Sequence, residues 1–147
     1  MKLSIGCDHG GYETKEKVKE YLISKGHIVI DCGTDSLQSC NYPEFAFKAA
    51  MKVKEKEADK GILICTSGEG IMIAANKVEG IRCGIGYNDE VSSLIVQHNH
   101  CNMIAFGAKY MSVEDIERRI DIFLSSTPLE GRHEIRVKMI EDYEKNR

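Results

Sequence analysis

The chain has 147 residues, of which 42% are apolar and 29% are charged, as is usual for one soluble globular domain with a hydrophobic core. The formal net charge of −3 offers no basic surface for nucleic acid, and no run of basic residues indicates a membrane surface. The first apolar stretch, Leu3 to Cys7, is too short for a signal-peptide core or a membrane span. We therefore expect a cytoplasmic protein with a single domain over residues 1–147 and with no nucleic-acid or membrane partner.

Short apolar runs alternate with longer helical patterns along the chain. The runs predict strands at Leu3–Cys7, His27–Asp31, Gly61–Cys65, Arg82–Gly86 and Met103–Phe106. Apolar residues at helical spacing predict helices around Phe45–Val53, Val91–His98 and Val113–Leu124, and a last helix over roughly Arg132–Lys145. This alternation predicts an α/β fold: a single-domain, Rossmann-like three-layer sandwich. It would have a five-stranded parallel sheet, helices on both faces and an extra C-terminal helix.

The six cysteines are expected to be free rather than paired in disulfides. They are Cys7, Cys32, Cys40, Cys65, Cys83 and Cys101. No export signal precedes them, and a chain of this length does not need covalent staples. No Cys-x-x-Cys pair is present, which argues against a structural zinc site, so we expect no bound metal.

In a parallel α/β sheet the ligand binds beyond the carboxyl ends of the strands, so the residues that follow each strand are the first candidates. The first predicted strand is followed by Asp8-His9-Gly10-Gly11. Two polar side chains before glycines that open a helix could bind a polyol and an anion. The same residues could equally form a strand-to-helix turn in which Asp8 caps the helix.

The third predicted strand ends in the most informative segment, Cys65-Thr66-Ser67-Gly68-Glu69-Gly70. A loop with glycines can direct backbone N–H groups at a ligand, at the positive end of the next helix. The same field favours a thiolate on Cys65. A thiolate beside groups that stabilise an anion is suited to removing a proton next to a carbonyl. The alternative is an inert, buried cysteine before a packing turn.

Two further groups stand out near the end of the chain. His98 lies close to the fifth predicted strand, but it also falls on the apolar face of its helix and could be a core histidine. Arg132 and Arg136 are four residues apart and so share one face of a helix, where arginine forks suit phosphate oxygens. A solvated basic face is the commoner meaning of such a pair taken alone.

Five motifs, in order and in spacing, resemble the ribose-5-phosphate isomerase type B family, and together they cover nearly the whole chain. They are Gly6–Gly11, the block Cys65–Lys77 ending in Ile-Ala-Ala-Asn-Lys, Gln97–Asn99, Ala105–Gly107, and Gly131–His133 with Arg136-Val137. The family also includes isomerases of allose 6-phosphate and galactose 6-phosphate.

The resemblance implies a catalytic role for four residues. Cys65 matches the cysteine that abstracts the proton, and Asp8 and His98 match residues linked to opening of the furanose ring. Ser67 matches the side chain of the loop that holds the enediolate oxygens, together with the backbone of Thr66, Gly68, Glu69 and Gly70.

The resemblance also implies a set of substrate contacts. Tyr42 and Asn99 match sugar contacts, and His9, Arg132 and Arg136 match positions at the phosphate or the sugar end next to it. Lys109 stands where the family usually has arginine; it keeps the charge but loses the fork. Thr66, Glu69 and Asn41 are further departures from the usual pattern.

The same resemblance implies a homodimer or homotetramer with active sites between subunits. It also implies that the enzyme uses no metal or other cofactor. The implied reaction is an aldose–ketose isomerisation, foremost of ribose 5-phosphate to ribulose 5-phosphate in the pentose phosphate pathway. A six-carbon sugar phosphate is the alternative substrate.

Three other functions share some of these residue patterns. A cysteine phosphatase needs an arginine six residues after the cysteine, but that residue is Ile71. Gly68, Gly70, Ala74 and Asp89 fit a dinucleotide-binding pattern after a strand, but Glu69 would oppose a pyrophosphate. A sugar-phosphate sensor without catalysis remains an alternative that an activity assay would distinguish.

Overall fold

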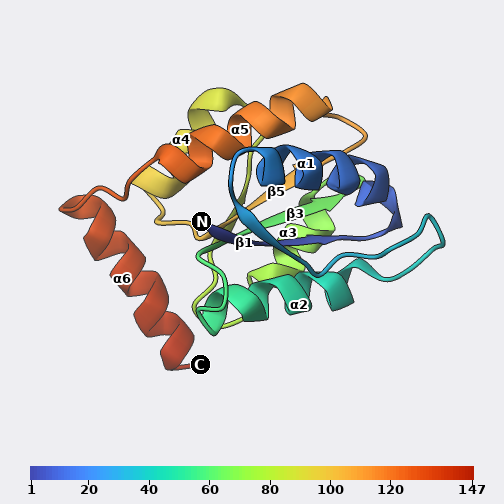
Figure 1. Ribbon diagram of the computed structural model, residues 1–147. Coiled ribbons are helices and arrows are strands. Elements are labelled where there is room, and N and C mark those ends of the chain that lie inside the picture. The colour runs from blue at the N-terminus through green and yellow to red at the C-terminus, as the bar shows by residue number, and fades with distance from the viewer.

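The computed structural model describes all 147 residues and builds the chain around five strands (Figure 1). The strands are β1 (Lys2–Cys7), β2 (Ile28–Asp31), β3 (Lys60–Cys65), β4 (Cys83–Ile85) and β5 (Met103–Gly107). The helices are α1 (Tyr12–Ser24), α2 (Tyr42–Lys54), α3 (Glu69–Ala75), α4 (Asp89–Gln97), α5 (Val113–Ser125) and α6 (Arg132–Lys145), with the short 3-10 helix η1 (His9–Gly11) before α1. Each strand lies at the position that its apolar run predicts.

The five strands form one parallel sheet in the order β2-β1-β3-β5-β4. The chain runs outward from β1 to β2 and then returns to add β3 on the other side of β1. The carboxyl ends of β1 and β3 therefore flank the point where the strand order reverses, which is where open α/β sheets bind ligands. The register pairs Cys7 with Ile64, so Asp8 and Cys65 emerge side by side at this point.

Alternation along the strands divides the core between two faces of the sheet. Leu3, Ile5 and Cys7 of β1 contribute to one cluster, which also receives the apolar faces of α1, α4 and α5. Leu63 and Cys65 of β3 face the opposite way, where α2 and α3 pack. Figure 1 shows these two groups of helices above and below the sheet. The predicted three-layer architecture is confirmed, and all six cysteines are free.

Helix α6 lies outside the three layers. It follows Gly131, whose φ of +71° is a backbone conformation that favours glycine, and only His133 and Val137 on it are buried. In Figure 1 the helix stands apart from the body of the molecule, on the side where β1 begins. The extra C-terminal helix is thus also confirmed. No helix of the protein combines the length and the apolar character needed to cross a membrane.

Candidate active site

Asp8 and Cys65 form the buried centre of the candidate site: Asp8 directly follows β1, and Cys65 is the last residue of the adjacent strand β3. Asp8 is 6% exposed and Cys65 is 5% exposed. One carboxylate oxygen of Asp8 accepts the backbone N–H of Gly10 at 2.9 Å, so Asp8 caps η1 as the structural interpretation predicts. The cap uses Oδ1 of Asp8, and the carboxylate has further acceptor capacity for a substrate hydroxyl.

The loop after β3 wraps tightly around the sulfur of Cys65. The backbone N–H of Gly68 lies 3.1 Å from Sγ and donates to it, an arrangement that stabilises negative charge on the thiol. Gly68 has φ +86°, and a Cβ there would come within 2.9 Å of the backbone of Phe106. Only glycine meets both conditions, so this residue fixes the path of the loop.

The rest of the loop is tied to the end of β5 and leaves its polar side chains exposed. The amides of Ala108 and Lys109 donate to the carbonyls of Cys65 and Thr66 at 2.9 and 3.1 Å. The side chains of Thr66, Ser67 and Glu69 are exposed, and Ser67 Oγ accepts the N–H of Glu69 at 3.2 Å. These exposed side chains therefore place polar groups next to Cys65 in the chain, where a substrate can reach them.

Three other predicted substrate contacts surround the same loop. The ring of Tyr42 lies over Gly70, where a Cβ would fall 2.6 Å from Cζ and 3.0 Å from the hydroxyl oxygen. His9 accepts the backbone N–H of Cys40 on Nδ1 at 3.2 Å. A neutral His9 must then carry its proton on Nε2, which leaves that N–H to donate to a ligand. Lys109 is exposed just after β5.

We call these residues the carboxyl-edge cluster, since all of them follow the carboxyl ends of strands or lie against the residues that do. The cluster consists of Asp8, His9, Tyr42, Cys65, Thr66, Ser67, Gly68, Glu69, Gly70 and Lys109.

The remaining four predicted site residues lie at the other end of the sheet. His98 and Asn99 follow α4 and precede β5, next to Asn102, whose carbonyl accepts the N–H of Gly61 at the start of β3. The start of α6 is held there by the N–H of Leu129, which donates to the carbonyl of Gln97 at 3.0 Å. We call His98, Asn99, Arg132 and Arg136 the amino-edge cluster.

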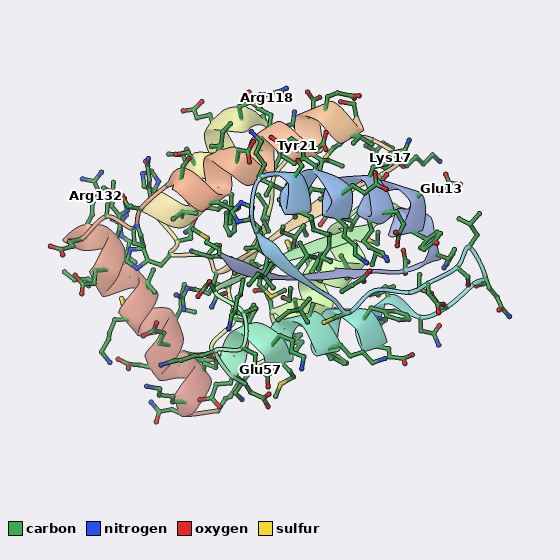
Figure 2. All side chains as sticks on the ribbon, viewed as in Figure 1. Glu13, Lys17, Tyr21, Glu57, Arg118 and Arg132 are labelled. Atoms are coloured by element: carbon green, nitrogen blue, oxygen red, sulfur yellow. The ribbon has the colours of Figure 1, made fainter.

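One chain does not bring the two clusters together. Strand β5 separates them; it has five residues, and at about 3.3 Å per residue its ends are about 13 Å apart. In Figure 2, Arg132 on α6 and Glu13 at the start of α1, just after η1, lie at opposite ends of the molecule. The predicted joint action of Cys65, Asp8 and His98 on one sugar stays a prediction.

No enclosed cavity surrounds the carboxyl-edge cluster in a single chain. The two cavities of the protein lie elsewhere, one of about 500 Å³ beside α2 and one of about 320 Å³ beneath α6. The cluster is therefore an open surface around a buried thiol, and it has no wall opposite Cys65.

Sequence reasoning gave no role to His133, which the structure places against His98. The two imidazole rings stack with centroids 4.2 Å apart and planes 2° from parallel. Burial lowers the pKa of His133, as does the positive charge of its neighbours, with His98 and Arg132 foremost among them. The adjacency of His133 to Arg132 in the Gly-Arg-His motif was the available signal, but it did not reveal the partner ring.

The chain is similar to known sugar-phosphate isomerases along most of its length. The family model described as "Ribose/Galactose Isomerase" matches residues 3–140. The chain is 39% identical over 146 residues to ribose-5-phosphate isomerase B of Escherichia coli, covering 99% of this chain and 98% of that protein. It is 42% identical over 126 residues to the galactose-6-phosphate isomerase subunit LacB of Clostridium acetobutylicum, covering 86% and 73% of the two chains.

Solved structures agree with the sequence comparisons. Ribose-5-phosphate isomerase B of Clostridium thermocellum superposes with a TM-score of 0.97 at 40% identity, covering 99% of each chain. The enzyme of Mycoplasma genitalium with bound ribulose 5-phosphate superposes with a TM-score of 0.94 at 33% identity, covering 99% of this chain and 97% of that one. These similarities confirm the resemblance that the five motifs indicate.

Proposed function

The chain belongs to the ribose/galactose isomerase family, and on that basis we propose that it is an aldose–ketose isomerase of phosphorylated sugars, acting on ribose 5-phosphate and ribulose 5-phosphate. The observation that carries the proposal is the position of Cys65. A buried thiol that accepts a backbone N–H, beside a loop of exposed polar groups at the reversal point of the sheet, is suited to moving a proton next to a carbonyl.

In the proposed reaction the thiolate of Cys65 removes the proton from C2 of the open aldose. The electrons of the C2–H bond form a C1=C2 double bond, and the carbonyl oxygen O1 takes the negative charge. Amides of the loop and the Ser67 hydroxyl stabilise that charge, at roughly 2–4 kcal/mol for each well-placed donor. The proton on O2 passes to O1, the carbonyl re-forms at C2, and the Cys65 thiol returns its proton to C1.

The other residues bind the sugar and open its ring. Asp8 and His98 move protons between the ring oxygen and the anomeric hydroxyl, while Tyr42 and Asn99 contact the sugar. The phosphate is bound by His9, Arg132 and Arg136, whose remote contacts orient the reacting end. Lys109 adds a positive charge near the bound sugar phosphate.

We further propose that the amino-edge cluster of a second copy completes the site over the carboxyl-edge cluster of the first. Two observations support this. The clusters lie at opposite ends of β5 in one chain, and α6 leaves an apolar face without a partner. On that face Ile135 is 63% exposed, Met139 66% and Tyr143 76%. A second copy would bury these side chains and supply the missing wall opposite Cys65.

Mixing two inactive variants tests this two-chain site. Cys65→Ala disables the carboxyl-edge cluster, and His98→Ala disables the amino-edge cluster. A mixed dimer has one site with both groups intact, so equal amounts should recover up to about a quarter of wild-type activity after subunit exchange. As a control, Cys65→Ala mixed with Ser67→Ala should recover none, because both changes lie in the same cluster. Mixed dimers of the first pair that remain inactive would place the whole site in one chain.

A coupled isomerase assay on three substrates tests the proposed activity itself. We expect ribose 5-phosphate to give a kcat/KM well above those for allose 6-phosphate and galactose 6-phosphate. The similarity to a galactose-6-phosphate isomerase subunit makes a six-carbon sugar the second candidate, and a reversed order of kcat/KM would select it. Turnover of none of the three would contradict the proposal.

Six free cysteines are typical of a reducing compartment, so we place the reaction in the cytoplasm.

A further inference from the structure

The stacked pair of His98 and His133 joins two elements that are far apart in the sequence. His98 is the C-cap residue directly after α4, and His133 lies in the first turn of α6. The rings lie face to face, 4.2 Å apart and within 2° of parallel. His133 is 9% exposed, and His98 is half-buried.

This arrangement differs from the way other histidines of the chain are held. His9 and His100 each have a ring nitrogen in a hydrogen bond to the backbone, with Cys40 and Leu129 respectively. Imidazoles that transfer protons are commonly oriented by such a bond to a carbonyl or carboxylate. For His98 the ring contact is the stack, which fixes the plane of the ring and leaves both of its nitrogens free.

The surroundings of the pair disfavour a positive charge on His133. Burial lowers the pKa of His133, and so does its proximity to His98, Arg132, Arg136 and His100. A neutral ring can remain stacked on either form of His98 without the repulsion that a second imidazolium would bring.

We infer that His133 is a positioning residue for His98, a stacked ring that holds the His98 imidazole in the orientation needed to open the furanose ring. This inference rests on the proposed function, since it assigns His98 to ring opening. It predicts that the loss of His133 slows the ring-opening step and leaves the proton transfer at Cys65 intact.

The two steps can be measured separately because the ketose substrate is acyclic. In ribulose 5-phosphate the C5 oxygen carries the phosphate and cannot close a furanose ring onto C2. Exchange of its C1 hydrogen with D2O, followed by NMR, therefore reports proton transfer without ring opening. Turnover of ribose 5-phosphate requires both steps.

The experiment compares His133→Ala, His133→Phe and Val137→Ala, each by both assays. We expect His133→Ala to lower kcat on ribose 5-phosphate about tenfold, part of the ~10²–10⁴-fold effect of a positioned acid or base, with C1 exchange changed less than about twofold. His133→Phe keeps a stacking ring and should recover most of the turnover. Val137 is the other buried residue of α6 but does not stack on His98, so Val137→Ala controls for weakened docking of the helix.

Three results would overturn the inference: equal losses in the two assays for His133→Ala, no recovery with phenylalanine, or the same selective loss in Val137→Ala. Failure of the proposed function would look different. In that case the wild-type protein itself would neither exchange the C1 hydrogen nor turn over ribose 5-phosphate.

Discussion

The two ends of the sheet carry the two halves of the candidate site, and they are built in different ways. The carboxyl-edge cluster is fixed by its own chain: Asp8 and Cys65 are almost fully buried, and backbone hydrogen bonds tie the loop after β3 to the end of β5. The arginines of the amino-edge cluster instead lie exposed on α6, a helix outside the three layers of the fold.

Few contacts connect α6 to its own chain. Beyond His133 and Val137, its polar ties are an ion pair of Glu141 with Arg82 at 3.2 Å and a hydrogen bond from the N–H of Gly80 to Glu144 at 2.9 Å. The reacting thiol thus lies where a single chain can hold it rigidly. The two arginines proposed for the phosphate sit on α6, an element that a second copy would stabilise.

The largest effect should come from the carboxyl edge. Cys65→Ala should lower kcat by ~10²–10⁴-fold, the usual contribution of a positioned general base, with little change in the affinity for sugar phosphates. Steady-state assays and calorimetric titration with ribulose 5-phosphate measure the two quantities. Cys83→Ala, at another buried free cysteine, is the matched control and should keep its turnover. If folded Cys65→Ala retained more than about a tenth of wild-type turnover, Glu69 would become the candidate base.

The second effect belongs to the amino edge and should appear in binding. Arg136→Ala should raise KM for ribose 5-phosphate by about 10- to 100-fold, as expected for a lost charge-assisted hydrogen bond to phosphate. Its effect on binding of unphosphorylated ribose should be small. Lys138→Ala removes another cation of the same helix, one paired at 2.7 Å with Asp142, and should change KM little. Equal effects on ribose and ribose 5-phosphate would contradict a phosphate role for Arg136.

Most of the fold could be predicted from the sequence because its signals are local. The strands are continuous apolar runs bounded by turns, and α6 begins after the break at Pro128 and Gly131, as predicted. The part of the carboxyl-edge cluster that comes at the ends of β1 and β3 could be located by the same reasoning, whereas Tyr42 and Lys109 were implied only by the family resemblance. Its supporting contacts, such as the amide of Cys40 on His9, arise in an irregular loop whose path has no periodic pattern.

The arrangement of the amino-edge cluster could be predicted only in part from the sequence. His98 was correctly predicted to lie close to the fifth strand. It lies near the start of β5, however, and so at the amino edge of the parallel sheet, opposite the carboxyl edge that holds Cys65. The stack on His133 depends on how α6 meets the end of α4, a contact between segments more than thirty residues apart that no local spacing records.

The third prediction concerns the ion pairs of the buried Lys15 near the carboxyl edge of the sheet. Lys15 is 1% exposed, and its Nζ lies 2.8 Å from Asp31 and 2.7 Å from Glu16. Lys15→Met leaves Asp31 partly buried beside an apolar side chain, which should lower the free energy of unfolding by roughly 1–3 kcal/mol. Denaturant unfolding measures the change. Lys19→Met removes the more exposed partner of Asp31, at 3.0 Å, and should cost less than about 1 kcal/mol. Equal losses of unfolding free energy in the two variants would contradict a larger stabilising contribution from the buried Lys15.

The smallest effect should be the pH dependence that His133 gives to the amino edge. Its pKa in the folded protein lies below the value of 6.5 expected for the unfolded chain. As the pH falls through about 6.5, the unfolded chain binds a proton that the folded protein refuses, so stability should decrease; above that range both states are neutral and His133 contributes no slope.

His27, whose pKa is also lowered, chiefly by burial, gives a slope of the same sign, so His133 must be isolated by difference. Denaturant unfolding of wild type and His133→Phe should therefore be compared between about pH 5 and pH 8 at one fixed protein concentration, since any oligomer adds its own concentration dependence. The stability of wild type should fall more steeply below about pH 6.5 than that of the variant, and the two curves should run parallel above it. Curves that stay parallel over the whole range would mean that His133 takes up its proton as readily in the folded protein as in the unfolded chain. The surroundings of the stacked pair would then not disfavour a positive charge on His133.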